Sequence, residues 1–167
     1  MIEGFSTARL AEAVGRRFPN AVVETTETAL YLQADSFREV AAFLKDAPGL
    51  EFDFLVAVTA VDYVDYFEMV YHLMSIAKSH AAVVKVKLFG RDDPVIPSVT
   101  PVWKGANYQE REVYDLMGIH FEGHPNLKRI FLWDEFPGYP LRKDFWYQNP
   151  SIGERWYQTT QEDATQD

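Results

Sequence analysis

The chain has 167 residues, a hydrophobic fraction of 47% and a net charge of −9, from 25 acidic and 16 basic residues. This length predicts a single domain, and the apolar content is sufficient for a core. The acidic balance argues against nucleic acid as a partner and against direct adsorption to anionic lipid, because both need a basic protein surface.

Missing residue types narrow the chemistry further. The chain has no cysteine, which excludes disulfides, thiolate nucleophiles and cysteine-ligated iron–sulfur or zinc sites within it. No apolar run approaches the roughly 18 residues that a membrane helix needs. The first residues, Met1 to Phe18, lack the apolar stretch of a signal peptide. We therefore expect a soluble, cytoplasmic protein.

The N-terminal part is predicted to begin with a helix and a hairpin. Ser6 can cap the helix, which ends near residues 16–18. The short β-like segments 21–24 and 29–33 follow, and the Thr/Glu connection between them favours a hairpin.

A second helix is predicted after the hairpin. Asp35 or Ser36 caps it, and Pro48-Gly49 stops it. Its apolar residues recur at helical spacing and are Phe37, Val40, Ala41 and Leu44.

The pattern then changes to that of a strand over Leu50–Tyr63. Alternation with a period of two is typical of a strand with one buried face. It places four apolar residues on that face, namely Phe52, Phe54, Val56 and Val58.

Two further strands are predicted at residues 67–76 and 82–89. The short connections between the three strands favour an antiparallel meander. The fold class is therefore α+β, with N-terminal helices packed on a mainly antiparallel sheet, followed by a helix and an extended C-terminal segment.

After the sheet, three prolines in residues 92–101 predict an extended connector rather than a regular element. Thr100 could begin a helix, but Gly105 interrupts it, so the helix is predicted only over 106–117. Gly118 follows where a helix C-terminus favours glycine. Beyond it, only residues 129–133 resemble a strand.

Residues 1–146 are expected to form one domain, and residues 147–167 a polar tail that is partly disordered. Within the domain, the part from 107 to 146 is predicted to be extended and to bind a partner. The stretch 107–144 interleaves many charges, glycines and prolines with Phe, Trp and Tyr. Aromatic and arginine side chains are enriched where a surface is buried against another protein.

The helix in this stretch carries four charged residues. Arg111 and Asp115 are four apart and can pair, and Glu110 lies close to the apolar face. An ordinary solvated helix face remains open as an alternative, with exposed pairs worth only ~0.3–0.5 kcal/mol each. Glu110 and Glu112 are two apart and point to nearly opposite sides of a helix, which argues against a catalytic carboxylate pair.

The chain has four histidines. His120 and His124 are four apart, but the glycines and the proline around them make this segment non-helical, so the helical metal-binding spacing does not apply. His124 is expected to fix a loop by hydrogen bonding. No nucleophile elbow, phosphate-binding loop or nucleotide fingerprint is present.

Several stretches resemble one family. Glu110–Ile119, with its Glu-Arg-Glu, Asp and Gly-Ile, resembles a signature of the 30-kilodalton or C subunit of NADH-quinone oxidoreductase, respiratory complex I. His124–Ile130 and Gly138–Phe145 resemble its His-Pro-Asp-Leu-Arg-Arg-Ile and Gly-x-Pro-Leu-Arg-Lys-Asp-Phe segments. Thr59–Tyr63 and Pro97–Thr100 also look like the family, so the resemblance covers about the last two thirds of the chain.

The resemblance implies a non-catalytic assembly subunit of the quinone module, peripheral on the cytoplasmic side of the cell membrane and attached through the complex only. It implies the hydrogenase-like D subunit as the main partner, with subunits B and I nearby. This chain would carry no cofactor, while FMN and iron–sulfur clusters in partner subunits pass electrons from NADH to quinone, coupled to proton translocation. The residues expected to bind a partner or order the interface are Glu110, Arg111, Glu112, Asp115, His124, Arg129, Arg142, Lys143 and Asp144.

We expect most of these charges to form one ion-pair network, made of Glu110, Arg111, Asp115, Arg129, Arg142 and Asp144. Departures from the family pattern are small: Met117 stands in place of Phe, Asn126 in place of Asp, and Lys128 in place of Arg. Two alternatives stay open, which are a homologous subunit of a membrane-bound [NiFe] hydrogenase, formate hydrogenlyase or related complex, and a free-standing enzyme that uses Glu110, Glu112 and His124.

Overall fold

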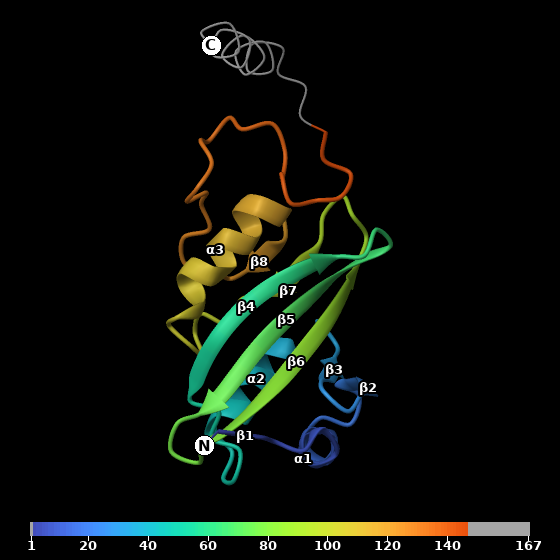
Figure 1. Ribbon diagram of the computed structural model, residues 1–167, viewed down its shortest axis with the longest axis vertical. Helices are drawn as coiled ribbons and strands as arrows, with labels where there is room; N and C mark the ends of the chain where they lie inside the picture. Colours follow the sequence, from blue (N-terminus) through green and yellow to red (C-terminus); the bar gives the residue numbers. More distant parts are fainter. Residues whose placement is uncertain (1, 147–167) are drawn as a thin grey trace, which may run out of the picture.

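The centre of the fold is an antiparallel meander (Figure 1). It consists of β4 (Phe54–Asp62), β5 (Tyr66–Ser75) and β6 (His80–Phe89). β5 and β6 pair without interruption from Tyr66 opposite Phe89 to Ser75 opposite His80. The computed structural model describes residues 2–146, so the tail predicted for 147–167 lies outside the described residues.

Three short strands, β1 to β3, extend the meander to a six-stranded sheet. Five of its strands follow the order β2-β3-β6-β5-β4, and β1 lies off this path and pairs with β6. β2 (Val22–Thr25) and β3 (Leu30–Leu32) form the predicted antiparallel hairpin. β3 and β1 (Glu3–Gly4) both pair with β6 in parallel. The sheet is therefore mainly antiparallel, which confirms the predicted α+β class.

Two helices bury the apolar stripes that the sequence predicts. α1 (Thr7–Arg17) follows Ser6, whose side chain accepts a hydrogen bond from the Arg9 N–H. α2 (Phe37–Asp46) lies behind the sheet in Figure 1 and buries all four residues of its stripe. The ring of Phe37 packs at 4.4 Å from that of Tyr71 on β5, so this stripe contributes directly to the core.

The third helix, α3 (Ala106–Met117), has the predicted bounds. It lies beside β4 (Figure 1), and the side chain of Gln109 accepts a hydrogen bond of 2.5 Å from the Val58 N–H. The helix ends at Gly118, which adopts a φ of 69°. A side chain there would also collide with the ring of Tyr139, so both the backbone and the C-terminal segment require glycine.

The predicted buried face of β4 is wrong in part. Phe52 and Val58 are buried, but Phe54 and Val56 are 45% and 48% exposed. The register of β4 against β5 shifts after Leu55, and such a bulge reverses which side chains face the core. Leu55, which strict alternation places on the solvent side, is therefore buried.

Two predictions after the sheet are also wrong. Part of the supposed connector is a strand, β7 (Val95–Pro97), which pairs in parallel with β8 (His120–Glu122). Residues 129–133 contain no strand. The N–H groups of residues 130–132 donate to a side-chain carboxylate instead of to a neighbouring strand, so no ladder forms.

The bulge can be tested by truncating the two neighbours that it places on opposite sides of β4. Leu55→Ala should lower the free energy of unfolding of the purified chain by about 2–4 kcal/mol, because it leaves a cavity in the core. Phe54→Ala should lower it by less than about 1 kcal/mol, because the ring is half exposed. Urea denaturation measures both, and a larger loss for Phe54→Ala would contradict the bulged register.

Candidate partner-binding site

Residues 127–146, called the C-terminal segment below, contain no helix or strand. In Figure 1 they form the orange to red loop beyond α3. An irregular chain needs partners for its backbone polar groups. Here, many of these partners are charged side chains, namely Asp115 and Arg111 on α3, Arg129 of the segment itself, and Asp62 at the end of β4.

Asp115 on α3 holds the start of the segment. Its carboxylate is completely buried. One oxygen accepts from the N–H groups of Ile130, Phe131 and Leu132 at 2.9, 2.7 and 3.1 Å, and the other accepts from Arg129 at 3.1 Å. Burial acts to raise the pKa of Asp115, but these donors outweigh it and leave the pKa lowered. Asp115 is therefore an ionised carboxylate that organises the chain around it.

Two arginines continue this arrangement. Arg129 donates to the carbonyls of Phe136 and Gly138, and its guanidinium lies 5.3 Å from the ring centre of Tyr139. Arg111 donates to the carbonyls of Lys128 and Arg129 at 3.0 and 3.3 Å. The predicted pairing of Arg111 with Asp115 is therefore wrong, because Asp115 pairs with Arg129 and Arg111 binds backbone.

Arg142 ties the segment to the C-terminal end of α3. It donates to the carbonyls of Met117 and Gly118 at 2.6 and 3.2 Å, and to that of Arg91 at 2.8 Å. The last carbonyls of a helix lack partners within the helix and carry partial negative charge, so a cation there is favourable. Arg142 thus caps α3 and fixes the segment in one contact.

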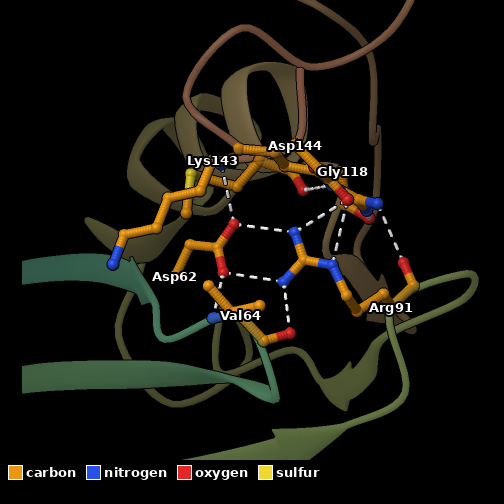
Figure 2. Close-up of polar contacts among 8 residues, drawn as sticks. Asp62, Val64, Arg91, Gly118, Lys143 and Asp144 are labelled. Atoms are coloured by element: carbon orange, nitrogen blue, oxygen red, sulfur yellow. Dashed lines mark hydrogen bonds and ion pairs between the residues drawn. The ribbon is translucent and has the colours of Figure 1, made fainter.

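A further group of contacts, called the Asp62 anchor below, lies at the end of β4 (Figure 2). Arg91 forms a two-fold ion pair with Asp62 at 2.7 and 2.8 Å and also binds Asp144 at 3.0 Å. The second oxygen of Asp62 also accepts the Lys143 N–H at 2.9 Å. The hydrogen bonds from Arg91 hold the pKa of Asp62 well below its ordinary value. Lys143 therefore contributes its backbone, and Asp144 an outer ion pair.

Glu110 belongs to a different cluster. Its fully buried carboxylate accepts from the hydroxyls of Ser98 and Thr100 at 2.6 and 3.1 Å and from the Val99 N–H at 2.7 Å. Burial raises the pKa of Glu110 despite these donors. No ion pair joins Glu110 to an arginine within residues 2–146, so the prediction of a single network is wrong. The charges form separate clusters around Glu110, Asp115 and Asp62.

His124 fixes a loop as predicted. Its Nδ1 accepts from the Asn126 N–H at 3.0 Å, so Nε2 carries the proton and donates to the Asn107 carbonyl at 3.1 Å. Burial lowers the pKa of His124, which favours this neutral form. Its Nε2 lies 4.0 Å from the Glu110 carboxylate, beyond hydrogen-bonding distance.

These groups do not converge on a common point. Glu110 is buried and Glu112 is exposed, as their spacing on the helix predicts. Within residues 2–146, no three His, Asp or Glu side chains are placed to hold a metal ion. The same part of the chain has no helix of the length and apolarity that crossing a membrane requires.

The C-terminal segment exposes large apolar side chains beside its charged ones. Its exposed large side chains are Phe131 (64%), Trp133 (53%), Leu141 (59%) and Trp146 (80%). Apolar side chains held outward on a fixed backbone are typical of a protein interaction site.

The sequence reasoning missed Asp62 and Arg91. Asp62 is the one charged residue of β4, whose other residues except Thr59 are apolar, and this is the signal that could have marked it. Nothing in the sequence marks Arg91, because its partners lie 29 and 53 residues away.

Comparison with known proteins matches residues 30–151 to the family described as respiratory-chain NADH dehydrogenase, 30 Kd subunit. Among similar proteins, the C subunit of the NADH-quinone oxidoreductase of Moorella thermoacetica is 47% identical over 78% of this chain and 88% of its own length. That of Cupriavidus taiwanensis is 40% identical over 83% and 74%. The C subunit numbered 2 of Rhizobium meliloti is 47% identical over 64% of this chain, which spans only 59% of that longer protein.

A solved structure shares the fold. It is a chain of the membrane-bound sulfane sulfur reductase, an archaeal respiratory membrane complex, with a TM-score of 0.68 and 25% identity. The match covers 90% of this chain and 91% of the other.

The Asp62 anchor predicts a specific dependence on pH. A carboxyl with a lowered pKa contributes its full stabilisation of the folded state above the ordinary aspartate range near pH 3.9, and this contribution declines progressively as the pH falls from there toward the lowered pKa of the folded state. Asp62→Asn should therefore lower the free energy of unfolding by roughly 2 kcal/mol at pH 7, and by a smaller amount near pH 3, where the contribution has begun to decline. Urea denaturation at both values tests this, with exposed Asp65→Asn as the control. An equal loss at both pH values would refute an ionised anchor.

Proposed function

Because the chain belongs to the 30 kDa subunit family of respiratory-chain NADH dehydrogenase, we propose that it is a non-catalytic structural subunit of the peripheral arm of an NADH-quinone oxidoreductase. It supports the quinone module, and it binds the D subunit through the C-terminal segment, with subunits B and I nearby. One observation on the C-terminal segment supports this proposal. The Asp115 and Asp62 clusters fix its irregular backbone, and large apolar side chains on it are exposed.

The division of work within the complex follows from the same features. FMN and iron–sulfur clusters belong to partner subunits, since this chain has no cysteine to hold a cluster. The complex carries electrons from NADH to quinone and translocates protons, and this chain lies at the cytoplasmic side of the membrane, attached through its partners. The nine residues predicted to bind a partner or order the interface keep that role here, with Glu112 as the exposed member on α3.

A second candidate is a subunit of a related membrane complex with another electron donor or acceptor. The likeness to a chain of the sulfane sulfur reductase complex favours it. Identities of 40% and 47% to C subunits of NADH-quinone oxidoreductases, against 25% to that chain, favour the quinone-reducing complex.

Deletion of the gene tests the proposal directly. Membranes of the deletion strain should lose NADH-dependent quinone reduction, and a plasmid copy should restore it, because the complex fails to assemble without this chain. The rate of NADH oxidation with a soluble quinone measures the effect. Normal activity in the deletion strain would refute the structural role, and loss of a different reductase activity would favour the second candidate.

Arg111→Ala tests whether the order of the C-terminal segment matters for assembly. It removes two hydrogen bonds to carbonyls of the segment, so the purified chain should lose only about 1 kcal/mol of folding free energy. The amount of intact complex on a native gel should fall more strongly, because the segment is loosened at its start.

Two matched variants accompany this test. Glu112→Ala changes the adjacent, exposed charge and should fold normally, so it shows how much assembly depends on charge alone. Lys128→Arg restores the family residue and should be tolerated, because the contact to Arg111 uses the Lys128 carbonyl. Normal assembly of Arg111→Ala would mean that the helix presents only an ordinary solvated face.

A further inference from the structure

Val64, at the tip of the β4–β5 hairpin, has a backbone conformation that valine rarely adopts. Its φ is 72°, and its side chain is exposed, with a relative accessibility of 55% for the residue. A β-branched residue with positive φ is strained, whereas glycine or asparagine takes this conformation at little cost. Strained residues gather at functional sites, so the feature invites a functional explanation.

The strain is maintained by the Asp62 anchor. The Val64 N–H donates to Asp62 at 2.7 Å, and the Val64 carbonyl accepts from Arg91 at 2.8 Å (Figure 2). Both backbone groups of Val64 are thus fixed by the ion pair that also binds Lys143 and Asp144. The hairpin tip and the C-terminal segment are held together by one pair of charged side chains.

Exposed apolar side chains occur both on the segment and on this tip, which the Asp62 anchor holds together. Leu141 on the segment is 59% exposed, and Tyr63 next to Val64 is 45% exposed. The ring of Tyr66 links Tyr63 to Phe89, with ring centres 5.1 and 5.6 Å apart, and Phe89 is 73% exposed. We call Tyr63, Val64, Phe89 and Leu141 the hairpin ridge.

The charges around the hairpin ridge define the partner. Within the anchor, Asp62 and Asp144 are balanced by Arg91 and Arg142. The exposed charged residues that neighbour the anchor in the sequence are the acidic Asp65, Asp92 and Asp93 and the basic Lys143, so acidic residues predominate there. An apolar centre with an acidic edge fits a protein surface that is apolar in the middle and basic at its margin, and it repels nucleic acid and anionic lipid.

We infer that the hairpin ridge is a second part of the partner-binding surface, which the chain bound by the C-terminal segment also covers. Arg91 and Asp62 act as positioning residues that hold Val64 outward. The inference rests on the proposed function and extends its interface from the C-terminal segment to the sheet. Folding alone gains nothing from a strained valine at an exposed turn, whereas a partner that buries the side chain does.

The test separates stability from assembly. Val64→Gly relieves the strain, so the melting temperature of the purified chain should rise by about 2–4 °C. It also removes the side chain, so the amount of intact complex in membranes should fall about fivefold. Val64→Asn tolerates the same backbone without the flexibility of glycine and should show the same loss of complex.

Ser79→Gly is the matched control. Ser79 is exposed, also has a positive φ of 55°, and lies at the opposite end of β5 and β6. This variant should raise the melting temperature similarly and leave the amount of complex unchanged.

The outcomes distinguish the two proposals. The proposal that the hairpin ridge binds the partner would be refuted by wild-type amounts of complex with Val64→Gly and Val64→Asn. It would also be refuted if Val64→Gly did not raise the melting temperature. If the deletion strain still lacks quinone reduction in that case, the structural role stands without the ridge. Retained activity in the deletion strain would overturn both.

Discussion

The structure of the candidate site depends on how the backbone of the C-terminal segment is satisfied. A chain of this length outside helices and strands exposes N–H and carbonyl groups, and each one buried without a partner destabilises the fold. Asp115 accepts from three consecutive N–H groups of the segment, and Arg111 and Arg129 donate to carbonyls of the segment. Arg142 donates in the other direction, from the segment to the Met117 carbonyl at the end of α3. Charged side chains here replace the partner strand that the segment lacks.

This arrangement explains why buried charges occur in a chain that shows no convergent catalytic groups within residues 2–146. An isolated buried carboxylate is costly, but one that accepts several hydrogen bonds and pairs with arginine stays ionised. The lowered pKa values of Asp62 and Asp115 fit that description, whereas Glu110, bound by two hydroxyls and one N–H, keeps a raised pKa. The clusters therefore differ in character: two attach the C-terminal segment, and one joins α3 to the loop before it.

Local patterns predicted the elements well. Helix stripes identified the helices, with the Ser6 cap at α1 and Gly118 at the end of α3, and alternation with short turns identified the meander, because these signals depend on residues close in sequence. The predicted cap of α2 is wrong, since the Ser36 side chain makes no hydrogen bond to the helix. The bulge in β4 and the pairing of β7 with β8 depend on hydrogen bonds to segments that are distant in sequence, so no local pattern predicts them. The supposed strand at 129–133 failed for the same reason, since its N–H groups donate to Asp115.

The candidate site was predictable as a region but not as a set of contacts. Density of charge and aromatics marked Arg111, Asp115, Arg129 and Arg142, which all form hydrogen bonds to or from the C-terminal segment. It nevertheless paired Arg111 with the wrong partner and left out Asp62 and Arg91. Ion pairs between residues distant in sequence follow from topology, which composition does not encode.

The likeness to a chain of a sulfane sulfur reductase complex bears on what this fold contributes. A scaffold that holds its surface loops by internal ion pairs keeps them ordered before any partner binds. Under the proposed function, the outward side chains of this chain then determine which partner it binds. The charged groups of the Asp62 and Asp115 clusters already have hydrogen-bond partners within the chain. The strained Val64 is consistent with that division: the charged pair beneath it fixes the backbone, and the exposed apolar surface above it is left for recognition.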